Sequence, residues 1–379
     1  MSKDITLSAG VRQNLLSLQD IAQLTSTTQN RLASGKRVNT ALDNAVNFFT
    51  SSGLQSRASD LSALLDAMSS AIQTVQQASN GMGAITTTIQ SMQATLMQAR
   101  QDASWQSTSY TYGVTATGHV LSFTGGAIGT TAVTVSLDTA GAIDTLDQVV
   151  NAINNTAGLV GKVKASNDAG HLRIQNLSTT ALNLVGEAGG TIDGSTSTDS
   201  VNGNTVRLNL ITQFNLLRDQ LDKFAADSSF NGVNLLQGDV LKVVFNELST
   251  STLDIKAVDV NGNPMTVNST NLGITALTSS SLDSNTNIDN ILSGLTVSLQ
   301  NTRSLASNFG SNLSVVQNRQ DFTNKMITTL KTGADNLVIA DTNEEGANML
   351  ALQTRQQLSI TALSLANQSN QSVLRLFGG

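Results

Sequence analysis

A seven-residue repeat of hydrophobic side chains runs through two long stretches of this chain. In residues 54–99 one heptad position is occupied by Leu61, Met68, Val75, Met82, Ile89 and Leu96. In residues 288–337 one heptad position holds Leu295, Phe309, Val316, Leu330 and Leu337. Such a repeat lets a helix bury one narrow seam against a second helix. Because neither stretch contains proline, we expect a single antiparallel coiled coil built from both ends of the chain.

The composition favours slender helical packing over one large globular core. Aromatic residues make up 3% and charged residues 13% of the 379 positions, with a net charge of −6. Nucleic acids and anionic membranes both require a basic face, so neither is an expected partner. The chain has no cysteine, which excludes a disulfide framework and a thiolate metal site.

The beginning of the chain bears on how the protein could be exported. Residues 1–10 lack the apolar run of a secretory signal, and no stretch is long and apolar enough to be read as a membrane span. If the protein is exported, we expect a dedicated machine to recognise it in another way.

The amino-acid composition changes in the middle of the chain. From about Ser104 the sequence turns to Thr, Gly, Ser and Val, and the runs Val120–Phe123 and Ala132–Leu137 are β-branched and bounded by glycines. Both features are typical of strands. Spaced hydrophobic residues at 146–153 predict one helix before a later strand at 171–174. Residues 106–200 therefore read as a small β-rich domain inserted between helices.

Further along, helix returns at 206–226, and Ser229–Gly232 is a turn signal that leads into strands at 241–245 and 253–260. The predicted fold class is α+β, with a long antiparallel coiled-coil rod made from both chain ends, a β-hairpin region and the inserted β-rich outer domain. The predicted domains are a terminal helical domain (1–45 with 335–379), a helical rod with the hairpin (46–105 with 201–334) and the insert (106–200).

Short motifs at the two ends resemble those of flagellin, the subunit of the bacterial flagellar filament. Gln29–Asn39 resembles the family's "RLSSGxRIN", Ser229–Leu236 its "QFNGxxLL" and Gln317–Arg319 its "QNR", while the "ANQxxQxVL" ending is matched from Ala366 to Leu374. The matching positions are Arg31, Leu32, Gly35, Asn39, Asp43, Phe230, Asn231, Gly232, Gln317, Asn318, Arg319, Asn367 and Gln368.

The resemblance implies a non-enzymatic structural subunit, without cofactor, that leaves the cell through the flagellar type III export system. It implies a secreted location in the extracellular flagellar filament and partners that are copies of the same chain, hook-associated and cap proteins, and an export chaperone. Amphipathic ends of this size bury little by themselves and are marginal as isolated helices. We therefore expect folding coupled to assembly through Val11, Leu15, Leu18, Leu32, Leu358, Leu363, Leu365, Val373, Leu374 and Phe377.

Two departures from the family pattern carry expectations of their own. The β-rich insert precedes the hairpin motif, whereas in many flagellins the outer domain follows it; through Leu146–Asn154 it is similar to a small repeat module of some flagellins and hook proteins. Residues 89–99 carry no charge, where many flagellins have the charged "QRxRELxxQ" stretch that an animal innate receptor recognises. Weak or absent activation of that receptor is therefore expected.

Two alternatives remain beside the filament subunit. A hook–filament junction protein would share the terminal helices, and a secreted adhesin or enzyme would carry its activity in 106–200, where no catalytic grouping is visible. His119 and His171 are solitary, so no metal site is expected.

Two groups of charged residues carry structural expectations. The acidic residues Asp341, Glu344 and Glu345 are expected at the solvated start of a helix, where they oppose its dipole. The cations Arg31, Arg37 and Arg319 either fix the register of the apolar seams or are ordinary solvated surface.

Overall fold

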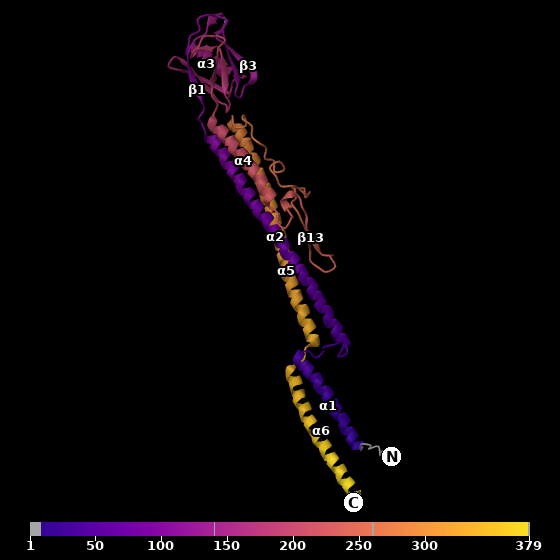
Figure 1. Ribbon diagram of the computed structural model, residues 1–379. Helices are drawn as coiled ribbons and strands as arrows, with labels where there is room; N and C mark the ends of the chain where they lie inside the picture. Colours follow the sequence, from indigo (N-terminus) through magenta and orange to yellow (C-terminus); the bar gives the residue numbers. More distant parts are fainter. Residues whose placement is uncertain (1–8, 140, 260, 378–379) are drawn as a thin grey trace. The chain divides into compact units, whose positions relative to one another are not determined.

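The computed structural model describes residues 9–139, 141–259 and 261–377, without the side chains of residues 139, 370 and 373–377. The chain divides into two compact units. The first unit consists of Met1–Ser69, Val244–Thr252 and Asn318–Gly379, and the second of Ser70–Val243 and Leu253–Gln317. Long helices from both chain ends and one β-rich region between them confirm the predicted α+β class (Figure 1).

The helices fall where the hydrophobic spacing predicts them. Their bounds are α1 (Ala9–Ser34), α2 (Ala45–Gln101), α3 (Leu146–Asn155), α4 (Thr205–Asp227), α5 (Asn285–Val338) and α6 (Thr342–Phe377). Every member of the first heptad set, Leu61 to Leu96, is buried on α2. On α5, Leu295, Phe309 and Val316 are buried, and Leu330 and Leu337 are half-buried. The repeat therefore marks the seam of each long helix. No helix in the described part of the chain has an apolar stretch long enough to cross a bilayer.

The seam joins α2 to α5 in antiparallel register within each unit. In the first unit, Ala58 and Leu61 of α2 pack with Ile327 of α5. In the second unit, Gln93 Nε2 donates to Thr296 Oγ1 at 3.3 Å, and Arg100 Nε lies 2.6 Å from Asp289 Oδ1. Rising positions on α2 thus meet falling positions on α5, as the sequence predicts.

In the second unit α4 lies beside both long helices (Figure 1). The helix α2 carries Gly81, although glycine costs about 1 kcal/mol in a helix interior. A Cβ atom at this position would lie 2.8 Å from Cβ of Ser228, the residue that follows α4. Glycine is therefore needed here to let α2 approach the end of α4.

In the first unit α1 and α6 lie side by side (Figure 1). The helix α1 ends at Ser34, and Gly35 adopts the left-handed φ of 66° that ends a helix at low steric cost. The backbone N–H groups of Arg37 and Val38 donate to the carbonyl of Val338, at 2.6 and 3.2 Å. The helix therefore breaks after Ser34, and these bonds fasten the break to the end of α5.

The insert contains two sheets around one hydrophobic core. A five-stranded sheet has the order β6-β7-β1-β10-β9, and a four-stranded sheet has the order β11-β8-β2-β3. The strands of the first are β1 (Ser107–Tyr112), β6 (Val163–Asp168), β7 (His171–Asn176), β9 (Glu187–Ala188) and β10 (Thr191–Ile192). Those of the second are β2 (Val120–Gly125), β3 (Gly129–Ser136), β8 (Leu182–Val185) and β11 (Thr198–Val201), and a two-stranded ribbon joins β4 (Asp138–Thr139) to β5 (Ala142–Ile143).

The core of the insert explains why these strands stay together. Tyr110, Phe123 and Leu172, from three different strands, are fully buried. The inward face of α3, with Val149 and Ile153, packs on the same cluster. The expected helix at 146–153 and the strands at 120–123, 132–137 and 171–174 are confirmed, apart from Leu137, which follows the end of β3.

The hairpin region begins with a tight turn. Phe230 and Val233 exchange backbone hydrogen bonds of 2.9 and 3.0 Å, and both central residues, Asn231 and Gly232, have positive φ. These are the features of a type I′ turn, which Asn-Gly favours. A short 3₁₀ turn, Leu235–Gln237, leads to β12 (Leu241–Val244) and β13 (Thr252–Ile255). The strand predicted at 253–260 is therefore too long, because β13 ends at Ile255. The chain then turns through Asp259, whose carboxylate accepts from the backbone N–H groups of Asn261 and Asn263.

Candidate interaction surface

An ion pair sets the register between α1 and α6. Arg31 Nη1 lies 3.2 Å from Glu345 Oε1, and only 8% of the Glu345 side chain is exposed. Asp341 Oδ1 accepts from the backbone N–H of Asn343 at 2.9 Å, so it caps the start of α6. Asp341 and Glu344 are exposed as expected, but the expectation that Glu345 is solvated was wrong. The long Arg31 side chain reaches it across the pair and covers it.

The leucines on one side of α6 remain uncovered. Leu350, Leu358 and Leu365 are 67%, 65% and 62% exposed. Their spacings of eight and seven residues place them on one side of the helix. Leu352 and Leu363, which are buried and half-buried, lie on the opposite side, toward α1. The pair thus buries one face of α6 and leaves a second apolar face open.

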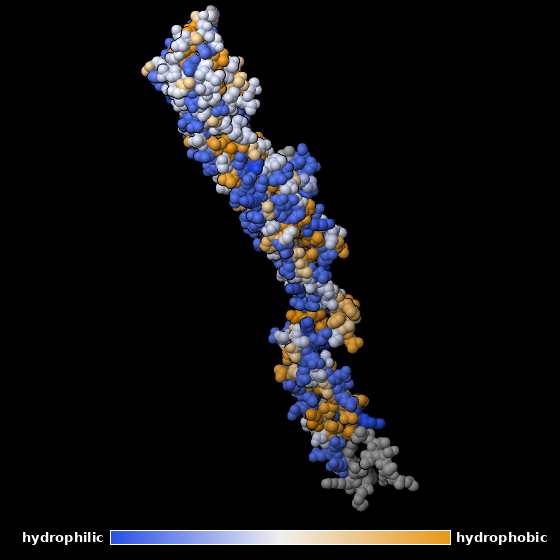
Figure 2. All heavy atoms as spheres, turned by 45° about the horizontal axis from the view of Figure 1, so that its top comes forward, coloured by the Kyte–Doolittle hydropathy of each residue, from blue (hydrophilic) through white to orange (hydrophobic). Residues whose placement is uncertain are grey.

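The predicted assembly residues divide by their exposure. Val11 is buried, and Leu18 and Leu363 are half-buried, whereas Leu15, Leu32, Leu358 and Leu365 are exposed. The side chains of Val373, Leu374 and Phe377 lie outside the described residues. Sequence reasoning missed four further exposed hydrophobic residues on these helices, namely Leu16, Leu24, Leu350 and Ile360. Figure 2 shows hydrophobic side chains gathered on the surface of this pair.

The motif residues at the break after α1 hold a compact loop. The Asp43 carboxylate accepts from the backbone N–H groups of Asn39 and Thr40, at 3.0 and 2.9 Å. These bonds, that of Thr40 first, hold the pKa of the Asp43 carboxyl below its usual value. Asn39 Nδ2 in turn donates to the Lys36 carbonyl at 3.0 Å. The polar residues of this motif therefore shape the backbone between α1 and α2.

The remaining motif residues have varied surroundings. The Arg319 guanidinium lies over the Phe245 ring, 5.4 Å from its centroid, next to the ion pair of Arg57 with Glu247 at the hairpin tip. Arg319 therefore has a specific contact, as Arg31 does, while the exposed side chain of Arg37 has none among the described contacts. Phe230 and the helix residues Gln317, Asn318, Asn367 and Gln368 are exposed.

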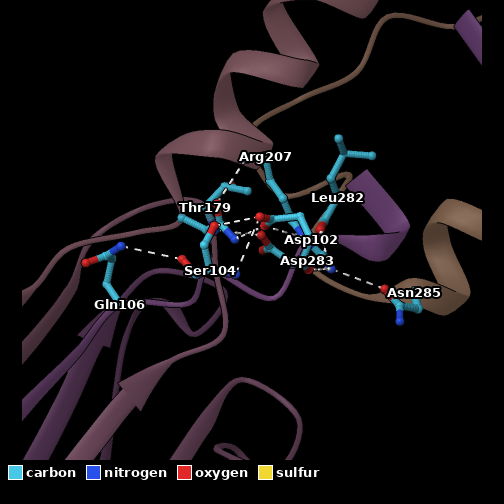
Figure 3. A network of polar contacts seen from close by, with 9 residues as sticks. Asp102, Ser104, Gln106, Thr179, Arg207, Leu282, Asp283 and Asn285 are labelled. Carbon is cyan, nitrogen blue, oxygen red and sulfur yellow. Dashed lines mark hydrogen bonds and ion pairs between the residues drawn. The ribbon is translucent and has the colours of Figure 1, made fainter. Parts of the chain in front are cut away.

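A buried polar network fixes the insert where the chain enters and leaves it (Figure 3). Arg207 is 2% exposed. Its Nη2 donates to the Asp102 carbonyl at 2.8 Å, its Nη1 donates to the Leu282 carbonyl at 2.6 Å, and its Nε lies 3.6 Å from Asp102 Oδ2. The Trp105 ring stacks on the guanidinium, 4.3 Å from Cζ. One arginine therefore connects the end of α2, the start of α4 and the segment before α5.

The two carboxylates near Arg207 respond differently to burial. Burial raises the pKa of the Asp283 carboxyl, and hydrogen bonds from Thr179 N (2.8 Å) and Ser178 Oγ (3.1 Å) offset this only in part. Burial also opposes ionisation of Asp102, but hydrogen bonds from Ser104 and Asn204 outweigh it and hold the pKa of Asp102 below its usual value. Sequence reasoning missed this network, because its members are far apart in the chain and follow no local spacing.

Neither the helix pair nor the network has the form of a catalytic centre. Among the described residues, no three His, Cys, Asp or Glu side chains gather as metal ligands. What the fold offers is long paired helices with an uncovered apolar face. Large exposed apolar surfaces on soluble proteins mark sites of protein association. The class that these features define is a structural subunit that associates with other protein chains.

Comparisons with known proteins identify the family. Residues 9–112 match the bacterial flagellin N-terminal helical region, and residues 292–377 match the bacterial flagellin C-terminal helical region. The chain is 31% identical over 226 residues to flagellin FljM of Caulobacter vibrioides, covering 59% of this chain and 79% of that protein. It is 26% identical over 407 residues to flagellin A of Rhizobium meliloti, covering 96% of both. A flagellin of Brucella melitensis is 30% identical over 176 residues, covering 44% of this chain and 61% of that protein.

The chain belongs to the bacterial flagellin family. It is a structural subunit of the extracellular flagellar filament, and the predicted family and function are confirmed.

The buried network yields a stability prediction. Arg207→Ala should lower the free energy of unfolding by about 3–5 kcal/mol, because it leaves buried carboxylate and carbonyl groups without their partner. Arg100→Ala is the matched control, since its ion pair with Asp289 is about half exposed and should contribute about 0–1 kcal/mol. Urea unfolding of the full chain, followed by circular dichroism, measures both. Equal losses in the two variants would contradict the role given to Arg207.

Proposed function

We propose that the open faces of α1 and α6 are the surface through which this subunit polymerises. The observation that carries the proposal is the exposed row Leu350, Leu358 and Leu365 on the side of α6 that faces away from α1. Covering such side chains gives about 1.5–3 kcal/mol each, and only further chains can cover them. The predicted set from Val11 to Phe377 belongs to this proposal, with Leu16, Leu24 and Ile360 added to it.

The proposed assembly surface is part of a proposed division of the chain into three domains. Residues 1–45 with 335–379 would form the terminal assembly domain, 46–105 with 201–334 the rod and hairpin, and 106–200 an outer domain. Support comes from the separate hydrophobic core of the insert and from the break after α1.

Partners beyond copies of the chain follow from the exposed helices. A chaperone that covers α1 or α6 would keep the subunit from associating before export. Hook-associated and cap proteins would present matching helices at the two ends of the filament. The proposed route remains the flagellar type III system.

A hook–filament junction protein is the alternative role, and assembly distinguishes the two. A filament subunit polymerises by itself into long tubes, whereas a junction protein does not. Electron microscopy of the purified chain, seeded with filament fragments, tests this directly. Failure to elongate under conditions that elongate a known flagellin would favour the junction role.

The first prediction from this proposal concerns the open face of α6. Leu358→Asp should leave the monomer folded, because this side chain is 65% exposed, and should stop filament growth, because assembly would bury an unpaired charge. Leu363→Asp should also stop growth, with some loss of monomer stability, since Leu363 is half-buried toward α1.

Val160→Asp is the matched control, since Val160 is 57% exposed but lies in the insert. Sedimentation and electron microscopy of seeded samples measure growth. Normal filaments from Leu358→Asp, or an equal defect in Val160→Asp, would refute the assignment of the assembly face.

A second prediction is that the insert is dispensable for polymerisation. The chain enters and leaves it at one place, where Arg207 Nη2 lies 2.8 Å from the Asp102 carbonyl, so a short Gly/Ser linker can replace residues 106–200. We expect export and growth to persist and the filament to be thinner by electron microscopy. Complete loss of assembly, in a shortened chain shown to be helical, would place the insert in the filament wall.

The third prediction is weak activation of the animal flagellin receptor. On α2 the exposed residues of the relevant stretch include Gln90, Ser91 and Ala94, which are uncharged, and the nearby Arg100 is engaged by Asp289 at 2.6 Å. Losing several charge-assisted hydrogen bonds, at roughly 1.5–3 kcal/mol each, should weaken binding by orders of magnitude.

A cell reporter assay with purified monomer measures this activation. The double variant Ser91→Arg with Ala94→Glu restores charge at exposed positions and should raise activity. Full activation by the unmodified chain at the concentration that a charged-motif flagellin needs would exclude the prediction.

A further inference from the structure

The outer strands of the insert differ in how their free edges are covered. Unpaired backbone groups on an edge strand invite pairing with another chain, and natural proteins block them. On β6 the block is a side chain from α3. Asn154 Nδ2 donates to the Ala165 carbonyl and Asn154 Oδ1 accepts from Ala165 N–H, both at 2.9 Å. The amide therefore takes the place of a neighbouring strand, and Lys164 and Asp168 add charge to the same edge.

The edges formed by β9 and β11 are protected by other means. The strand β9 has two residues, Glu187 and Ala188, and is too short to act as a template. The strand β11 has four residues. It contacts β9 of the other sheet, and its Asp199 carboxylate accepts from the Tyr110 hydroxyl at 2.8 Å. Three of the four outer strands of the two larger sheets are thus blocked, short or charged.

The strand β3 is the exception. It has eight residues, Gly129–Ser136, with neither a charge nor a proline. It pairs with β2 along one side, and within the described residues no strand pairs with its other side. Figure 1 shows β3 at the margin of the insert.

The register of β3 tells which backbone groups are open. Leu137 N–H donates to the His119 carbonyl at 2.9 Å. Hydrogen-bonded pairs alternate along an antiparallel ladder, so Val135 and Val133 bond to β2. The N–H and C=O groups of Ala132, Thr134 and Ser136 point to the open side, and all three residues are exposed.

We propose that β3 pairs through this edge with β3 of a second copy of the chain, in antiparallel orientation. The other outer strands of the two larger sheets are blocked, short or charged, so the matching long edge in the same protein is β3 itself. The strand is neutral, and two copies do not repel each other there. With Thr134 opposite Thr134, Ala132 faces Ser136, and each pair exchanges both of its backbone hydrogen bonds.

Such a contact is distinct from polymerisation. The same patch meets itself about a twofold axis, so the contact closes at two copies. A helical polymer that grows by one repeated step instead needs two different surfaces that fit each other. The β3 edge therefore links inserts in pairs. Pairing of inserts through β3 is favoured in filaments, because each filament presents many inserts at high local concentration. The inference rests on the edge of the insert and stands apart from the assembly face of α1 and α6.

Cross-linking of the full soluble chain tests the pairing. The chain has no cysteine, so Thr134→Cys introduces a single thiol. Hydrogen-bonded partners in an antiparallel ladder have Cα atoms about 5.5 Å apart, a separation that a disulfide spans. The control is Asn183→Cys, an exposed position on β8 that is paired on both sides, with Ser200 of β11 and with Thr124 of β2.

Under mild oxidation at equal concentration, Thr134→Cys should form dimers at least about tenfold faster than Asn183→Cys, because pairing holds the two thiols together. Adding Ala132→Pro removes one outward N–H, which an edge strand tolerates, and should return the rate to that of the control. Adding Ala132→Lys should also lower the rate of dimer formation to that of the control, because two like charges would face each other across the contact. If circular dichroism shows that the proline variant is unfolded, the lysine variant provides the test. Equal rates for the two cysteines, or a Thr134→Cys rate that a folded blocking variant leaves unchanged, would overturn the proposal.

Discussion

A pair of helices can cover only one strip of each helix, and the rest of this protein depends on that constraint. Where a third helix is present, as with α4 beside α2 and α5, more faces are covered and the heptad residues from Val75 to Leu96 are fully buried. Where α1 meets α6 alone, Leu350 and Leu358 stay two-thirds exposed. In the proposed assembly, other chains supply the missing burial at the ends of the chain, which would couple folding of these helices to assembly.

The sequence predicts the long helices well because their signal is local and repeated. Each turn of α2 and α5 contributes to the same seven-residue pattern, so single deviations such as Thr302 and Thr323, which occupy seam positions and are buried, do not obscure it. The Asn231-Gly232 turn is equally local, since two adjacent residues with positive φ suffice to define it. The exposure of the proposed assembly residues could be predicted only in part, because helical spacing shows that a face is apolar but not whether a neighbour covers it. Val11 and Leu358 have similar chemistry and opposite exposure.

Features that depend on distant residues could not be predicted. Arg207, Asp102 and Asp283 have ordinary surroundings in sequence, and only the tertiary fold places the two half-buried carboxylates beside the buried guanidinium of Arg207. The same holds for Glu345, whose burial requires Arg31 to reach it from another helix. The strand order of the insert is a further case. Alternation identifies single strands, whereas the parallel pairing of β1 with β10 and the antiparallel pairing of β1 with β7 are set by the shared core around Tyr110 and Leu172.

The polar network and the sheet edges together explain how a β-rich domain can be inserted into a helical subunit without changing the packing of the helices. Arg207 bonds to Asp102 at the end of α2 and to Leu282 before α5, so the junction is closed on the helical side. Asn154 closes one sheet edge inside the insert. Hydrogen bonds of this kind are costly to break, so the polar groups at the junction and at this sheet edge are satisfied within the chain itself. The uncharged edge of β3 has no such closure. It is therefore the place on the insert where the backbone can still gain hydrogen bonds, and the place where a change of sequence would alter association without altering the helices.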